Sequence, residues 1–196
     1  MIFFHIFVPT TSHNAMKYLS FFILLFIGEL SVSAQHMFSR QFPFFNQLSS
    51  NEIFSIHQDR EGYFWIGTTN GLARYDGYQL NTFRTDYKNQ NLLTDNGITA
   101  INDNDLYVWI GTWKGLNLYN KQTCRITPFS DARLLDKVVD AITVDKDGNV
   151  WVSAGGMIYR CDSTAHIIKE YEVGNIQEGY AISNIYVDQQ KQLWAV

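Results

Sequence analysis

IFSIHQDREGYFWIGTTNGLARYD, the stretch from Ile53 to Asp76, contains a pattern that returns three more times in this chain. In each copy an apolar run leads to a polar turn and then to a Trp among apolar residues, and in the first three copies a short loop and a further apolar run follow. The tryptophans that mark the copies lie 44, 42 and 43 residues apart and are Trp65, Trp109, Trp151 and Trp194. Several strand-like runs in each period of this length are typical of the blades of a β-propeller.

Each complete repeat is expected to form one four-stranded antiparallel sheet. In the first repeat the predicted strands are 53–58, 63–68, 72–75 and 78–84, and the turns between them are rich in Gly, Asn and Asp. The fourth repeat reaches Val196 in its second strand. The prediction is therefore an all-β fold, a β-propeller of about three and a half four-stranded blades in an incomplete ring. A cut blade exposes a sheet edge, so we expect the chain to be the front part of a longer product.

The N-terminal residues have the layout of a secretory signal peptide. The apolar run from Tyr18 to Gly28 follows Lys17 and precedes small residues, and it is about half the ~20 residues needed to cross a bilayer. Cleavage is expected after Ala34, and Met16 is a possible true start. The predicted segments are a signal peptide (1–34), an N-terminal strand segment (35–52), three blades (53–97, 98–138 and 139–181) and the start of a fourth (182–196).

The recurring residues have structural explanations. Trp can fill the space between two sheets, and Gly67 and Gly111 remove a side chain where the next sheet approaches. An Asp stands six residues before each Trp and is expected to accept backbone hydrogen bonds in the turn; these residues are Asp59, Asp103, Asp145 and Asp188. The second repeat is one residue shorter between its first apolar residue and its Asp, and the loop of the third repeat is interpreted as one residue shorter.

Two cysteines, Cys124 and Cys161, could pair outside the cytoplasm. Alignment of the repeats places Cys161 at the position of Asn120 and Cys124 four residues further on. Because these positions are not equivalent, free thiols are the expectation and a disulfide stays open.

Composition excludes several classes of function. A net charge of −4 does not favour nucleic acid, which clustered Lys and Arg bind. The five histidines have no metal-ligand spacing, and the stretch that begins at 145–149 lacks the Gly at position six, the Glu at position twelve and the flanking helices of a calcium loop. No metal, cofactor or catalytic residue is therefore predicted, and His57 is expected to be a half-buried residue with a hydrogen-bond partner.

A ligand would be expected at the loops between the second and third strands. Trp113 lies in such a loop, outside the recurring set, and an aromatic ring beside polar groups is what stacking on a sugar requires. The candidate site residues are Trp113 and Lys114 in one loop, and Thr69 and Asn70 in the other.

HQDREGYFWIGTTNGLARYDGYQLNTF (57–83) and VWIGTWKGLNLYN (108–120) resemble the two-component regulator propeller repeat of hybrid histidine kinases of the Bacteroides type. The resemblance implies a periplasmic sensor region, anchored in the inner membrane through the rest of the kinase, that detects oligosaccharides and regulates polysaccharide utilisation. It also implies the remainder of the sensor kinase and a second subunit as partners. Kinase activity would belong to the remainder, so this chain is not expected to be an enzyme.

Two alternatives stay open. One is a propeller that serves as a protein-interaction scaffold. The other is an extracytoplasmic lyase or glycosidase, which would require convergent carboxylates or a basic side chain on the central face.

Overall fold

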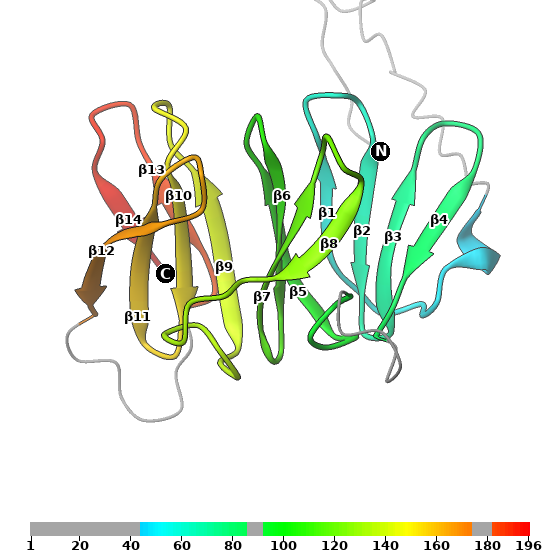
Figure 1. The fold of residues 1–196 in the computed structure, drawn as a ribbon, viewed down its shortest axis with the longest axis horizontal. Coiled ribbons are helices and arrows are strands. Elements are labelled where there is room, and N and C mark those ends of the chain that lie inside the picture. The colour runs from blue at the N-terminus through cyan, green and yellow to red at the C-terminus, as the bar shows by residue number, and fades with distance from the viewer. Residues whose placement is uncertain (1–43, 86–91, 174–181) are drawn as a thin grey trace, which may run out of the picture. The chain divides into compact units, whose positions relative to one another are not determined.

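The computed structural model describes residues 44–85, 92–173 and 182–196, and these residues confirm the all-β fold. Three four-stranded antiparallel sheets and one two-stranded sheet follow one another along the chain (Figure 1). The described ranges contain no α-helix, and no helix with the length and apolarity of a membrane span. The expected signal peptide lies outside the described residues.

Each sheet is one blade whose strands are neighbours in sequence order. The first blade consists of β1 (Ile53–Gln58), β2 (Phe64–Thr68), β3 (Gly71–Tyr75) and β4 (Leu80–Phe83). The second consists of β5 (Ile98–Asp103), β6 (Tyr107–Thr112), β7 (Gly115–Asn120) and β8 (Arg125–Pro128). The third consists of β9 (Val139–Val144), β10 (Val150–Ala154), β11 (Met157–Cys161) and β12 (Ile167–Glu172), and the fourth of β13 (Ile185–Val187) and β14 (Leu193–Ala195).

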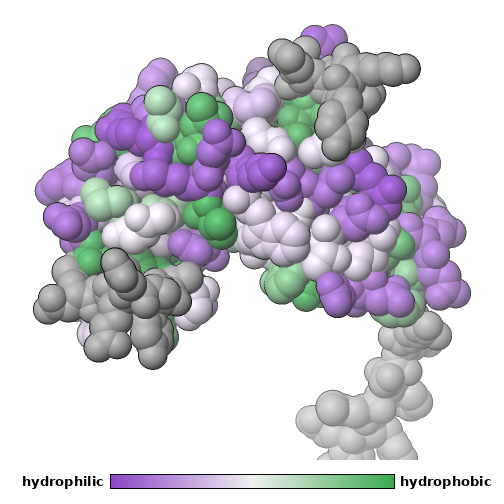
Figure 2. All heavy atoms as spheres, turned by 90° about the horizontal axis from the view of Figure 1, so that it is seen from below, coloured by the Kyte–Doolittle hydropathy of each residue, from purple (hydrophilic) through white to green (hydrophobic). Residues whose placement is uncertain are grey.

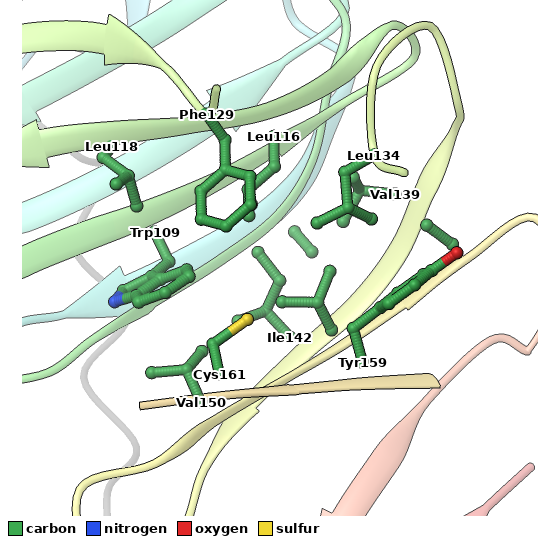
Figure 3. Packing of buried hydrophobic residues seen from close by; sticks show 13 residues of the cluster. Trp109, Leu116, Leu118, Phe129, Leu134, Val139, Ile142, Val150, Tyr159 and Cys161 are labelled. Carbon is green, nitrogen blue, oxygen red and sulfur yellow. The ribbon is translucent and has the colours of Figure 1, made fainter. Parts of the chain in front are cut away.

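The blades stack through their first strands. Strand β5 contacts both β1 and β9, and β9 contacts β13, so the described sheets form a series that does not close into a ring (Figure 1). Each junction between consecutive blades holds a cluster of buried apolar residues. Figure 3 shows the largest cluster, in which Trp109 and Phe129 of the second blade face Val150 and Tyr159 of the third.

Two glycines permit this close approach, as predicted. A Cβ atom on Gly67 would lie 2.6 Å from Cγ2 of Ile98, and one on Gly111 would lie 2.7 Å from Cγ1 of Val139. Contacts this short do not occur between real side chains, so each glycine fixes the distance between its blade and the next.

The segment before β1 is described from residue 44 onward. Phe45–Gln47 form one turn of 3-10 helix, called η1, after which the chain is extended at Leu48. The earlier part of the predicted segment, 35–43, is not among the described residues.

The strand register of the third blade corrects the length that the alignment of the repeats gave to its β10–β11 loop. The two residues that flank the β10–β11 loop, Ala154 and Met157, are paired with each other. Thr68 and Gly71 are paired in the same way across the β2–β3 loop of the first blade. No residue is missing from this loop, because Met157 takes the place of the glycine. The interpretation of a shorter loop was therefore wrong.

The same register moves Cys161 to the position of Tyr119, and not to that of Asn120. Cys161 is fully buried in the cluster between the second and third blades, and burial raises the pKa of its thiol to about 12. Cys124 is exposed, and the two thiols are free. Cys161 therefore acts as a small apolar residue of the core.

Candidate ligand-binding loops

The loops that carry the four candidate residues are held in one shape by a threonine. In the first blade Thr68 Oγ1 donates to the carbonyl oxygen of Gly71 at 2.9 Å and accepts from the backbone N–H of Asn70 at 3.1 Å. In the second blade Thr112 makes the same pair of bonds with Gly115 and Lys114, at 2.8 and 3.1 Å. Both threonine side chains are buried, so the loops are rigid supports for the residues at their tips.

A shared segment connects the two loops. The backbone N–H of Gly71 donates to the carbonyl oxygen of Asn96 at 2.7 Å, and the N–H of Trp113 donates to that of the next residue, Gly97, at 3.1 Å. The structure therefore brings the β2–β3 loop and the β6–β7 loop to adjacent residues of the chain that leads into β5.

Trp113 lies flat against this segment. A Cβ atom on Gly97 would be 2.4 Å from Cε3 of Trp113, so the indole ring covers a site that only glycine leaves open. The ring also meets Phe54 edge to face, with 6.3 Å between the ring centroids. Trp113 is nevertheless 44% exposed. One part of the ring is thus fixed by packing and another part is accessible to a ligand.

The three polar candidate residues differ in their hydrogen bonds within the protein. Thr69 Oγ1 donates to Ser50 Oγ at 2.8 Å, and Asn70 Nδ2 donates to the carbonyl oxygen of Ser49 at 3.3 Å. These bonds attach the loop to the segment before β1. Lys114 is exposed beside Trp113. Among the four candidates, Trp113 and Lys114 are exposed side by side, whereas Thr69 is half-buried and Asn70, although exposed, is hydrogen-bonded to the segment before β1.

Phe54 is a residue of this region that sequence reasoning missed. Its side chain is exposed although it belongs to the inner strand of a blade. The same strand position carries Thr99 in the second blade and Asp140 in the third, so an aromatic residue where the other repeats are polar was an available signal. Figure 2 shows the side of the molecule on which the β2–β3 loop lies, where apolar residues form separate small patches among hydrophilic ones.

A second polar cluster lies between the first two blades, around Asp103. His57 Nε2 lies 2.7 Å from Asp103 Oδ1, and Lys121 Nζ donates to Asp103 Oδ2 at 2.7 Å. Burial alone would raise the pKa of Asp103, but the hydrogen bonds from His57 and Lys121 outweigh burial and lower this pKa to about 2. His57 is half-buried and hydrogen-bonded, as expected.

Asp103 does not fix its turn, which corrects the prediction made by counting back from Trp109. Asn104 does so instead: its Oδ1 accepts from the backbone N–H groups of Leu106 and Tyr107, at 3.0 and 2.8 Å. The predicted role holds for Asp59, Asp145 and Asp188, each of which accepts two backbone hydrogen bonds in its turn. Counting forward six residues from the first apolar residue of each repeat would have found Asn104.

The three turn aspartates also accept a hydrogen bond from their own Trp. The distances from the indole Nε1 to Oδ2 are 2.6 Å for Trp65, 3.1 Å for Trp151 and 2.9 Å for Trp194. The indole N–H of Trp109 is buried and has no acceptor. Across the described part of the chain, no three His, Cys, Asp or Glu side chains are grouped so that they could hold a metal ion.

Comparison with known proteins places these features in a family context. Residues 47–70 match the family model described as "Two component regulator propeller". No curated protein matches the chain.

Solved structures with a similar fold include extracellular domains of two putative systems from B. thetaiotaomicron. That of the one component system BT4673 is 21% identical with a TM-score of 0.59, and that of the hybrid two component system BT3049 is 23% identical with a TM-score of 0.59. Each match covers 76% of this chain. This chain spans only about a fifth of the length of each of these structures, 21% for BT4673 and 20% for BT3049. Virginiamycin B lyase from Staphylococcus aureus is 19% identical with a TM-score of 0.58, over 74% of this chain and 48% of the lyase.

The match at residues 47–70 begins at the last residue of the 3-10 turn and covers β1, the turn at Asp59 and β2. The same strand order and register recur in the second and third blades. This chain is a series of β-propeller blades whose first blade contains a two-component regulator propeller repeat.

Proposed function

We propose that this chain is an extracytoplasmic sensor region of a hybrid two-component histidine kinase. The observation that carries the proposal is the family match at 47–70, within blades that repeat the same architecture. The fold shared with the extracellular domains from B. thetaiotaomicron agrees with this role. The predicted signal peptide at 1–34 would supply the route out of the cytoplasm.

The proposed ligand is an oligosaccharide, bound where the β6–β7 loop meets β1. The apolar face of a sugar ring can stack on an aromatic side chain while its hydroxyl groups take hydrogen bonds. Trp113 and Phe54 supply a pair of aromatic rings, and Lys114 supplies a donor beside them. Because Trp113 is held against Gly97, little side-chain entropy would be lost when a sugar binds.

A binding event could affect the arrangement of the blades through this same contact. Trp113 belongs to the second blade and Phe54 to the first, so a ligand on both rings would touch two blades. Such a ligand would shift an equilibrium only by its difference in affinity for the two arrangements. Transmission to the remainder of the kinase, through a paired subunit, is part of the proposal.

The test is a calorimetric titration of the purified chain with a panel of plant and host-glycan oligosaccharides. At least one oligosaccharide should bind, and Trp113→Ala should weaken its binding by about fivefold or more, since a stacked ring contributes on the order of 1–3 kcal/mol. Tyr78→Ala is the matched control, because Tyr78 is an exposed aromatic residue in the β3–β4 turn. The oligosaccharide proposal is wrong if the Trp113→Ala and Tyr78→Ala proteins bind every sugar as the wild type does.

A protein-interaction scaffold would give a different result. In that case no sugar would bind, and a protein from a periplasmic extract would be retained by the wild-type chain and lost with Trp113→Ala. The sensor assignment itself is tested separately, by asking whether deletion of the gene abolishes the transcriptional response to polysaccharides.

A further inference from the structure

The innermost strand of each of the first three blades contains a β-bulge at the same place. In each case the second residue of the strand has no partner on the next strand, although the residues on either side of it are paired. The three bulge residues are Phe54 in β1, Thr99 in β5 and Asp140 in β9. We call them the bulge row. A bulge re-aims the side chain of its strand, and bulges are common beside functional sites.

The chemistry of the bulge row changes from blade to blade, whereas that of its neighbours does not. The three bulge residues supply an aromatic ring, a hydroxyl group and a carboxylate. The residues before them are aliphatic and those after them are small, and they are Ile53, Ile98 and Val139, and Ser55, Ala100 and Ala141. Packing that recurs in every blade explains the neighbours but not the bulge row, which is therefore suited to recognising a ligand.

The bulge row begins at the candidate loops and crosses two junctions between blades. The Phe54 ring meets the Trp113 ring, and Thr99 Oγ1 donates to the carbonyl oxygen of Val139, the residue before Asp140, at 2.5 Å. Packed sheets lie about 10 Å apart, so the bulge row is no more than roughly 20 Å long. This length suits an oligosaccharide better than a single sugar unit.

Asp140 has a carboxylate that the protein leaves unpaired. Its side chain is half-buried, and no group among the described residues donates a hydrogen bond to it or forms an ion pair with it. Burial raises the pKa of Asp140, and no neighbouring group opposes this effect. An unpaired charge that is partly removed from water costs free energy, so ionised Asp140 destabilises the folded protein at pH 7. A carboxylate of this kind is typical of a binding site.

Ser153 is a second unpaired group at the same junction. It is fully buried, and its Oγ has no hydrogen-bond partner in the described part of the chain. Ser153 takes the place of Gly111, where an added Cβ atom would lie 3.1 Å from Thr99 Oγ1. The third blade therefore has Ser153 and Asp140 at two adjoining positions. Strand β13 of the next blade contacts β9, so this junction lies inside the series of blades.

We propose that the bulge row is an extended sugar-binding site in which Asp140 accepts hydrogen bonds from hydroxyl or ammonium groups of the ligand. The inference rests on the proposed function and adds the length and charge of the oligosaccharide. One sugar unit stacks on Trp113 and Phe54, and a later unit reaches Asp140. Because an ionised carboxylate only accepts hydrogen bonds and repels anions, the later unit is a neutral sugar or an amino sugar.

The test is a calorimetric titration of the full chain with oligosaccharides of increasing length, from disaccharides to hexasaccharides. The panel of the previous section is extended with cello-oligosaccharides, β-1,4-linked glucosamine oligomers and oligogalacturonates. Asp140→Asn should weaken binding of the longer sugars by about fivefold or more, since hydrogen bonds to a charged acceptor are the stronger ones. It should leave the binding of disaccharides at Trp113 unchanged. A larger loss for glucosamine oligomers than for cello-oligosaccharides identifies ammonium as the donor, and equal losses identify hydroxyl groups.

Asp136→Asn is the matched control. Asp136 is an exposed carboxylate on the chain that leads into β9, outside the bulge row, so this variant should bind every sugar as the wild type does. Urea unfolding at pH 7 separates a ligand-binding role from a structural one. Asp140→Asn should raise the urea midpoint because it removes an unpaired charge, whereas Asp136→Asn should leave the midpoint unchanged.

The possible failures are distinguishable. If no sugar binds the wild type, both the proposed oligosaccharide ligand and this inference are wrong. If sugars bind and Trp113→Ala weakens them, but Asp140→Asn binds every length as the wild type does, only this inference is wrong. A lower urea midpoint for Asp140→Asn would show that Asp140 is a structural residue, and a wild type that binds oligogalacturonates most tightly would overturn the assigned charge.

Discussion

Asp59, at the β1–β2 turn, and Asp103, at the β5–β6 turn, each lie six residues before a buried tryptophan, yet the two side chains make different hydrogen bonds. Asp59 accepts hydrogen bonds from two backbone N–H groups of its turn and from the indole N–H of Trp65. Asp103 accepts none from its turn or from Trp109. It instead binds His57 of the first blade and Lys121 of its own blade.

The cause of this difference is the position of one residue. In the second blade the turn begins one residue later, so Asn104 takes the backbone hydrogen bonds, and its Nδ2 donates to the carbonyl oxygen of Ser163 in the third blade. A side-chain amide has a single acceptor oxygen, which the turn already uses, and so Trp109 has no acceptor. Asp103 is thereby released from the turn and becomes a link between two blades.

The largest effect should come from removing that link. Asp103→Ala leaves the Lys121 ammonium, which is 5% exposed, without its counter-charge. Loss of one partner of a buried ion pair is expected to lower the free energy of unfolding by about 3–5 kcal/mol. Urea unfolding at pH 7, followed by tryptophan fluorescence, measures this loss.

Asp105→Ala is the matched control. Asp105 is also a blade-two aspartate that pairs with a residue of the first blade, Arg60, but its side chain is 83% exposed. An exposed ion pair contributes about 0–1 kcal/mol, so this change should be small. If Asp103→Ala costs no more than the ~0–1 kcal/mol expected for Asp105→Ala, the buried interactions of Asp103 with Lys121 and His57 do not stabilise the protein.

A smaller effect should appear in the dependence of stability on pH. The pKa of Asp103 is lowered from 3.8 to about 2 in the folded protein, so its ionised form contributes stability that is fully present above pH ~4. That contribution is lost as the pH falls from about 4 to about 2. The stability difference between the wild type and Asp103→Asn should therefore shrink over this range, by about 2 kcal/mol at most. A difference that stays constant between pH 4 and pH 2 would contradict this account.

Much of the fold could be predicted from the sequence, because the blade is specified by short-range patterns. The spacing of Trp65, Trp109, Trp151 and Trp194, with turn residues between apolar runs, is repeated and so gives the same information several times. The 3-10 turn at Phe45–Gln47 was not predictable in this way. It occurs once, and its conformation depends on contacts that no repeat reveals.

The candidate site was predictable only in part, for the same reason. Loop position identified Trp113, but the packing of its ring on Gly97 and Phe54 depends on a junction between two blades. The role of Asp103 was hidden because one spacing, counted from Trp109, gave the same answer as in the other repeats. In the second repeat, counting back from Trp109 gives Asp103, whereas counting forward from the first apolar residue of the repeat gives Asn104. This disagreement identifies Asp103 as the residue with a separate role.

The comparison of the two turns can be measured most directly on the tryptophans themselves. Trp65 and Trp109 are both fully buried, so replacement by Phe removes a similar apolar area from each. Trp65→Phe also leaves Asp59 Oδ2 without its indole donor, whereas Trp109→Phe removes an N–H that has no acceptor. Trp65→Phe should therefore lower the free energy of unfolding by about 1–2 kcal/mol more than Trp109→Phe.

A double-mutant cycle identifies the source of this gap. In an Asp59→Asn background the side-chain amide of residue 59 faces the indole N–H as a second donor, so Trp65→Phe should cost less than it does in the wild type. Its cost should approach that of Trp109→Phe. If Trp65→Phe costs the same with Asp59 as with Asn at that position, the gap reflects packing alone, and the buried Asp–Trp hydrogen bond contributes nothing measurable to the first blade.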